Sequence, residues 1–71
     1  MNKLPERLEE LREEKGLSRN QLCKILKLGG GTVFRWEMGQ STPNADYIIM
    51  LCEFFDCSAG YLLGLENIRR R

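Results

Sequence analysis

Apolar residues recur at helical spacing along the chain, in short stretches that glycine, proline, serine or asparagine separate. The first stretch has the clearest pattern, because Leu4, Leu8 and Leu11 fall on one face of a helix that Gly16 is placed to end. No stretch has the alternation of apolar and polar residues that marks a half-buried strand. A chain of 71 residues has room for one small domain. The pattern therefore predicts an all-α fold of five short helices.

A capping box marks the start of the second helix. Ser18 is the expected N-cap, and Gln21 lies three residues further on, where its side chain can reach back to the cap. Leu17 and Leu22 flank this cap at the two positions of a hydrophobic staple. We expect this helix to end near Lys27.

Three further helices are expected after the second. The third is expected over residues 30–38, and the fifth from Ser58 to Gly64. The fourth is expected to start at Thr42 or Asn44. In the third helix, Val33 and Trp36 should face the core. We expect one domain over residues 1–66 and a basic, flexible tail over residues 67–71.

The charged residues are distributed unevenly, although the net charge of the chain is only +1. Residues 15–42 hold five lysines and arginines against one acidic residue, whereas residues 1–14 hold three basic residues against five acidic ones. Residues 43–66 hold four acidic residues and no basic one, and the last five residues include three arginines. A basic segment between acidic flanks is typical of a surface that faces a polyanion.

The residues that carry catalysis or bind metals are sparse. The chain has no histidine, and the spacing of Cys23, Cys52 and Cys57 fits neither a zinc site nor a disulfide framework. We interpret the three cysteines as small buried residues in a reducing compartment. The glycine run lacks the preceding strand and the lysine of a phosphate-binding loop. We therefore expect no enzyme activity, cofactor, metal or small-molecule substrate.

The N-terminal residues bear on cellular location. Residues 1–12 lack the apolar run of a signal peptide, and no stretch approaches the about 20 apolar residues that a membrane span needs. We expect a cytoplasmic protein that does not contact a membrane.

The segment LSRNQLCKILKLGGGTVFRWEMGQSTP, residues 17–43, resembles the Cro/phage-repressor family, which is also called XRE-type or lambda-repressor-like. Three motifs support this resemblance: LREEKGLS at 11–18, RWEMGQSTP at 35–43 and CSAGYLLG at 57–64. A spaced apolar set supports it further, and its members are Leu22, Leu26, Leu28, Val33 and Trp36, with the small Cys23 at the helix crossing. The resemblance covers about residues 6–64 and implies a helix-turn-helix at about residues 18–38.

The resemblance also implies a function. Members of this family place their third helix in the major groove of DNA, and they occupy operator sites as homodimers. The chain should then be a sequence-specific transcriptional regulator of the phage or prophage repressor kind, with double-stranded DNA as its partner. The alternative is a protein-interaction module on the same scaffold, similar to an antitoxin or an anti-repressor, because the start of the third helix is reduced to glycine.

Gly30 and Gly31 occupy the positions that normally read bases in this family. Three interpretations are open: the bare backbone lets the helix approach DNA closely and bind a phosphate, the helix start orders only on DNA, or base reading has been lost. The family also has a left-handed residue in the turn after the second helix. Here that position is Lys27, at a cost of about 1 kcal/mol, unless the turn is displaced and Gly29 takes the role.

Arg35 is the best remaining candidate for base reading, by a bidentate bond to guanine, with a phosphate contact as the alternative. Thr32 is expected either to contact DNA or to cap its helix, and Phe34 either to meet a thymine methyl or to pack beside the core. Arg19 stands where the family contacts phosphate. The full set of expected DNA-contacting residues is Arg19, Asn20, Gln21, Gly30, Gly31, Thr32, Phe34, Arg35, Gln40, Ser41 and Thr42.

Two further sets follow from the resemblance. Arg12 and Glu37 match a structural charge pair that links the first helix to the end of the third, with two independent solvated charges as the alternative. Tyr61, Leu65 and Ile68 are the expected homodimer surface.

Overall fold

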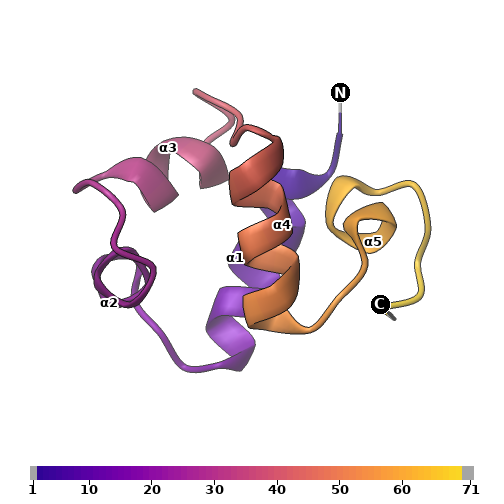
Figure 1. Ribbon diagram of the computed structural model, residues 1–71, viewed down its shortest axis with the longest axis horizontal. Coiled ribbons are helices and arrows are strands. Elements are labelled where there is room, and N and C mark those ends of the chain that lie inside the picture. Colours follow the sequence, from indigo (N-terminus) through magenta and orange to yellow (C-terminus); the bar gives the residue numbers. More distant parts are fainter. Residues whose placement is uncertain (1, 70–71) are drawn as a thin grey trace.

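The structure is a computed structural model that describes residues 2–69. It is built from five helices, which are α1 (Leu4–Glu14), α2 (Arg19–Ile25), α3 (Thr32–Glu37), α4 (Ala45–Phe55) and α5 (Ala59–Leu63) (Figure 1). Residues 2–69 form no strand, so the prediction of an all-α fold with five short helices is confirmed. Within the same residues, no helix is long and apolar enough to cross a membrane.

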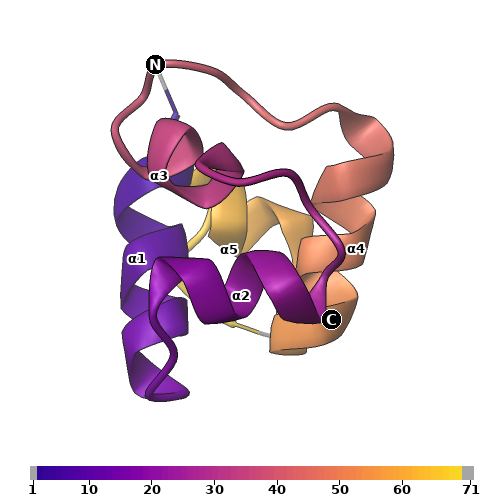
Figure 2. The ribbon, with the colours of Figure 1, turned by 90° about the vertical axis from the view of Figure 1, so that its left-hand side faces the viewer.

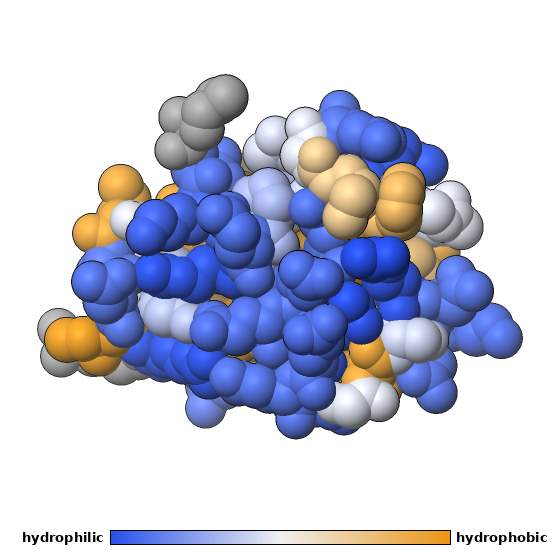
Figure 3. Space-filling model, turned by 180° about the vertical axis from the view of Figure 1, so that it is seen from behind, coloured by the Kyte–Doolittle hydropathy of each residue, from blue (hydrophilic) through white to orange (hydrophobic). Residues whose placement is uncertain are grey.

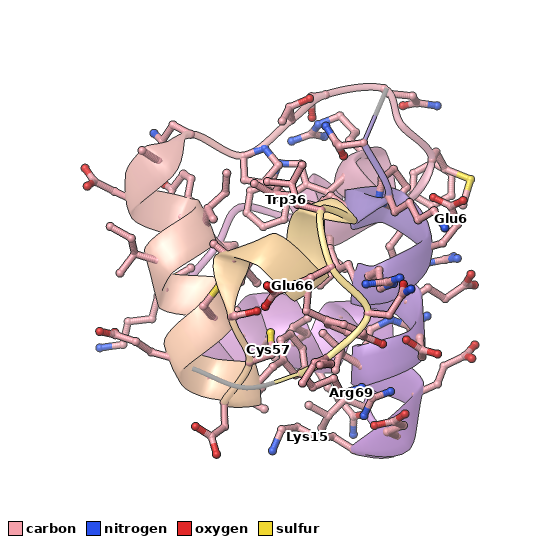
Figure 4. All side chains as sticks on the ribbon, turned by 90° about the vertical axis from the view of Figure 1, so that its right-hand side faces the viewer. Glu6, Lys15, Trp36, Cys57, Glu66 and Arg69 are labelled. Atoms are coloured by element: carbon pink, nitrogen blue, oxygen red, sulfur yellow. The ribbon has the colours of Figure 1, made fainter. Side chains whose placement is uncertain are left out.

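The helices surround one apolar core. In Figure 1, α1 and α4 stand at the centre, α2 and α3 lie on one side of them, and α5 lies on the other. Every helix contributes to the core, and its most deeply buried side chains are Leu4, Leu8, Leu22, Val33, Leu51, Cys57 and Leu62. The ring of Trp36 closes the core near α4, with its centroid 5.6 Å from that of Tyr47 (Figure 4).

Polar side chains cap the helices at the predicted starts. The Ser18 hydroxyl accepts a hydrogen bond from the Gln21 N–H at 3.0 Å, and the Gln21 side chain accepts one from the Ser18 N–H at 2.7 Å. The predicted capping box is therefore confirmed. Of the two candidates for the start of α4, Asn44 is the cap, because its side-chain oxygen accepts from the Tyr47 N–H at 2.9 Å. Ser58 caps α5 in the same way.

The third helix begins later than the sequence predicts. It starts at Thr32 rather than at residue 30, and Gly31 is its N-cap with a left-handed φ of +80°. A residue in that conformation cannot continue a right-handed helix. Gly30 and Gly31 therefore belong to the turn before α3, so the prediction that they open the helix was wrong.

The turn after α2 has its left-handed residue at Lys27, whose φ is +58°. Gly29 does not adopt a positive φ, so the alternative of a displaced turn was wrong. The Leu28 N–H donates to the Cys23 carbonyl oxygen at 2.8 Å, which closes this turn tightly against α2. Residue 27 therefore adopts the left-handed conformation that this turn requires, although it is a lysine.

The segment after α5 runs along α1 (Figure 4). Arg7 donates to the carbonyl oxygen of Glu66 at 3.0 Å and to the side chain of Asn67 at 3.0 Å. Arg69 forms an ion pair with Glu14, which raises the pKa of Arg69 and lowers the pKa of Glu14. Residues 67–69 of the expected flexible tail thus contact α1, and Arg70 and Arg71 lie outside the described residues.

Candidate nucleic-acid interface

Helices α2 and α3 meet at a steep angle over the short turn between them (Figure 2). Their contact is apolar and buried: Leu22 and Cys23 come from α2, and Val33 and Trp36 from α3. The small side chain of Cys23 is only 5% exposed. Because these side chains are buried together in the core, they restrict the orientation of α3 relative to the rest of the domain.

A buried carboxylate holds the C-terminal end of α3. The side chain of Glu37 is fully buried and accepts from Arg12 Nε at 2.6 Å and from Arg12 Nη2 at 3.2 Å. The hydrogen bond to Glu37 raises the pKa of the Arg12 guanidinium. Arg12 also donates to the Leu17 carbonyl oxygen at 2.6 Å, so the alternative of two solvated charges does not describe this pair.

Arg19 is a second partner of Glu37 that the sequence did not indicate. Its Nε donates to Glu37 Oε1 at 2.7 Å, and its Nη2 lies 3.7 Å from Glu9 Oε2. One carboxylate therefore joins α1, α2 and α3. The sequence indicated that Glu37 takes part in an ion pair. It did not indicate Arg19 as the second partner, because Arg19 lies eighteen residues away in another helix.

Phe34 stands next to Arg19 on the outer side of α3. Its side chain is exposed, at 42%, and it does not belong to the core cluster, so the interpretation as a residue packed beside the core was wrong. The Cζ atom of Arg19 lies 5.3 Å from the centroid of its ring, which is within the range of a cation–π interaction. An open hollow of about 450 Å³ lies here, and it is lined by Arg12, Ser18, Arg19, Asn20 and Phe34.

The N-terminal end of α3 carries little side-chain structure. Gly29 and Gly30 are exposed, and the N-cap Gly31 offers no side chain to the helix. Arg35 reaches back over this end, where its Nη2 donates to Thr32 Oγ1 at 3.3 Å. The start of α3 has no side-chain cap, and the Thr32 hydroxyl accepts from Arg35 instead of capping the helix.

The other expected DNA-contacting residues lie around these two helices. Asn20 and Gln21 are exposed at the start of α2, where the Gln21 oxygen is engaged in the capping box. Gln40, Ser41 and Thr42 are exposed in the loop after α3. Ser41 and Thr42 line a second hollow of about 190 Å³ beside the N-terminal residues.

The expected dimer residues differ in accessibility. Tyr61 is buried, and its hydroxyl donates to Glu10 at 2.5 Å while Arg7 lies over its ring at 4.0 Å. It cannot contribute to a free surface, so this assignment was wrong. Leu65 and Ile68 are exposed, at 83% and 58%. The face in Figure 3 is mostly hydrophilic, with a few small apolar groups among its polar side chains.

The side chains of Cys23, Cys52 and Cys57 are buried, and none of the three forms a disulfide. Burial raises the pKa of the Cys57 thiol to about 11, so the thiol stays protonated at neutral pH. Within residues 2–69, no group of three or more histidine, cysteine, aspartate or glutamate side chains could hold a metal ion.

The chain matches a family model and several known proteins. Residues 8–62 match the family model described as Helix-turn-helix (HTH_3). The chain is 25% identical over 68 residues to the HTH-type transcriptional regulator ImmR of Bacillus subtilis (strain 168), covering 96% of this chain and 54% of that protein.

Two further curated relatives are more similar in sequence. The HTH-type transcriptional activator BcrR of Enterococcus faecalis is 30% identical over 63 residues, which cover 89% of this chain and 31% of that protein. The HTH-type transcriptional regulator AnsR of Bacillus subtilis (strain 168) is 33% identical over 62 residues, which cover 87% of this chain and 53% of that protein. The chain therefore spans about half the length of two of these relatives and less of the third.

Proposed function

This chain belongs to the Cro/C1-type (XRE) helix-turn-helix family, and on that premise we propose that it binds duplex DNA at operator sites and regulates transcription. The names of its relatives as transcriptional regulators support this class of function.

The fixed placement of α3 is the observation that carries the proposal. Val33 and Trp36 anchor the helix in the core, and the carboxylate of Glu37 ties its end to two other helices. A recognition helix must present its outer side to the major groove at a constant angle. In this chain that outer side carries the exposed Arg35.

Base reading is assigned to Arg35 and the end of α3 that it covers. A bidentate bond from arginine to guanine O6 and N7 discriminates by about 1–3 kcal/mol. The glycines beside it favour close approach of the backbone to DNA. A Cβ built on Gly30 would meet no atom within 4 Å, so the packing within the domain does not require glycine there.

Contacts to the DNA backbone are assigned to both flanks of α3. Arg19, Asn20 and Gln21 stand at the start of α2, and Gln40, Ser41 and Thr42 stand in the loop after α3. These side chains can donate to phosphate oxygens, and such contacts set affinity and register but not sequence choice.

A homodimer on a two-fold symmetric operator completes the proposal. Its surface is assigned to Leu65 and Ile68, because both side chains are largely exposed on a segment that Arg7 and Arg69 hold against α1. Sedimentation of the wild-type chain and of Leu65→Ser tests this assignment. We expect a dimer that the substitution shifts toward monomer, and identical sedimentation of the two would contradict it.

The salt dependence of binding separates a DNA-binding domain from the alternative protein-interaction module. We expect the logarithm of the affinity for a labelled duplex to fall linearly with the logarithm of the salt concentration, by about 0.9 per phosphate contact. A folded chain that retains no duplex at low salt, or whose binding does not respond to salt, would refute DNA binding and favour the interaction module.

A further inference from the structure

Arg19 is partly exposed, and a buried carboxylate nevertheless fixes its side chain. Its side chain is 34% exposed, yet its Nε donates to the fully buried Glu37 carboxylate at 2.7 Å. An isolated arginine side chain samples many rotamers and loses that freedom when it binds a partner. Here the bond to Glu37 fixes the guanidinium before any ligand arrives.

The terminal nitrogens of Arg19 remain available. Glu9 lies 3.7 Å from Nη2, which is beyond hydrogen-bond distance, and its side chain is 44% exposed. The guanidinium carries five N–H groups, and the hydrogen bond to Glu37 uses the one on Nε. The terminal N–H groups can therefore donate to an acceptor in the hollow beside α2 and α3.

Phe34 supplies the second restraint on Arg19. It is a large apolar residue at an exposed position of the proposed recognition helix, where burial does not explain it. Its ring faces the Arg19 guanidinium at 5.3 Å, and both residues line the same hollow. The ring can therefore support the flat guanidinium from one side while Glu37 holds it at Nε.

We propose that Phe34 and Glu37 are positioning residues, which hold the Arg19 guanidinium ready to bind a DNA backbone phosphate in the hollow between α2 and α3. This inference rests on the proposed function. It assigns Phe34 to backbone contact through Arg19 instead of to a thymine methyl group. The hollow can receive a phosphate because Arg19 lines it together with the polar Ser18 and Asn20. Arg12 also lines it, but its guanidinium is already engaged by Glu37 and the Leu17 carbonyl oxygen.

The test measures duplex affinity and base preference for Phe34→Leu, Phe34→Tyr and Arg19→Ala. Leucine keeps an apolar side chain but removes the π face, so we expect affinity to fall about two- to fivefold on every duplex, with base preferences unchanged. Tyrosine keeps the ring and should retain wild-type affinity. Met38→Leu is the matched control, since Met38 is an exposed apolar residue at the other end of α3.

A double-mutant cycle isolates the action through Arg19. If Phe34 acts only by positioning Arg19, then adding Phe34→Leu to Arg19→Ala has no further effect on affinity. Arg19→Ala alone should reduce the salt slope by about 0.9, as expected for one lost phosphate contact. A loss of the same size from Phe34→Leu in both backgrounds would refute the proposal.

Two other results would also overturn the positioning role of Phe34, one of them together with the proposed function. A change of preference at one base pair in Phe34→Leu would assign Phe34 to direct base contact. No duplex binding by the wild-type chain would refute the proposed function together with this inference. In contrast, salt-dependent wild-type binding with an additive cycle would remove only the positioning role.

Discussion

The C-terminal end of α3 is held by a buried tryptophan and a buried carboxylate, whereas its N-terminal end has the buried Val33 on its inner side and no side-chain cap. At the C-terminal end, Trp36 lies in the core and the Glu37 carboxylate accepts hydrogen bonds from two arginines. At the N-terminal end, the helix begins at a glycine without a side-chain cap, and Arg35 folds back over it. The same six-residue helix thus has one end that the domain fixes and one end that it leaves open.

This difference separates the two tasks that a recognition helix performs. Its direction must be constant, and the buried contacts of Trp36 and Glu37 make it so. Its leading end must meet the partner, and residues with few internal contacts are free to do this. The comparison predicts that loss of the buried groups at the closed end lowers stability. It also predicts that substitutions at the open end change DNA binding without lowering stability wherever they fit its backbone conformation.

The largest expected effect is at Glu37. Glu37→Gln leaves Arg12 without its buried charged partner, and we expect the free energy of unfolding to fall by about 3–5 kcal/mol. Urea unfolding followed by circular dichroism measures this value. Glu13→Gln is the control, because the Glu13 side chain is 64% exposed and lies 3.9 Å from Arg12. Equal losses in the two variants would contradict the role of the buried carboxylate.

The next effect distinguishes two neighbouring glycines at the open end. Gly31→Ala forces alanine into a left-handed φ and places its Cβ 3.1 Å from Arg35 Nη1, so we expect a loss of about 1–2 kcal/mol of stability. Gly30→Ala meets no neighbour within 4 Å and should leave stability almost unchanged. Thermal unfolding of both variants measures the difference.

DNA binding by these two glycine variants sharpens the comparison. If Gly30 permits close approach to DNA, Gly30→Ala should weaken duplex binding although the domain remains as stable as the wild type. Unchanged affinity in Gly30→Ala would show that the open end does not contact DNA closely at that residue.

The smallest effect is expected in the turn between α2 and α3. Lys27→Gly relieves the strain of a left-handed lysine but increases the freedom of the unfolded chain, so we expect a net gain below about 1 kcal/mol. Lys24→Gly, inside α2, should instead lose about 1 kcal/mol, because glycine disfavours a helix interior. Chemical unfolding of both variants separates the two cases. A loss of equal size in both would mean that Lys27 is not strained.

Local features of this fold could be predicted from the sequence, because neighbouring residues determine them. The Ser18 capping box and the helical spacing of Leu4, Leu8 and Leu11 need only residues within a few positions of each other. The start of α3 was predicted two residues too early, since glycine permits both a helical and a left-handed φ. The choice between them depends on packing around the turn.

Contacts between distant residues were harder to predict. The family resemblance indicated Arg12 with Glu37, but no local pattern pointed to Arg19 as the second partner of that carboxylate. The family resemblance placed Tyr61 on a dimer surface, whereas Arg7 and Glu10 contact its side chain within the same chain. Such contacts depend on the relative placement of whole helices.

We propose above that α3 reads DNA through Arg35 from a fixed position. The most direct measurement is selection from a random duplex library by the wild-type chain and by Arg35→Ala in parallel. We expect the wild-type chain to enrich a two-fold symmetric motif, and the variant to lose preference at one base pair of each half-site. Identical motifs from the two proteins, or no enrichment by the folded wild-type chain, would contradict the claim.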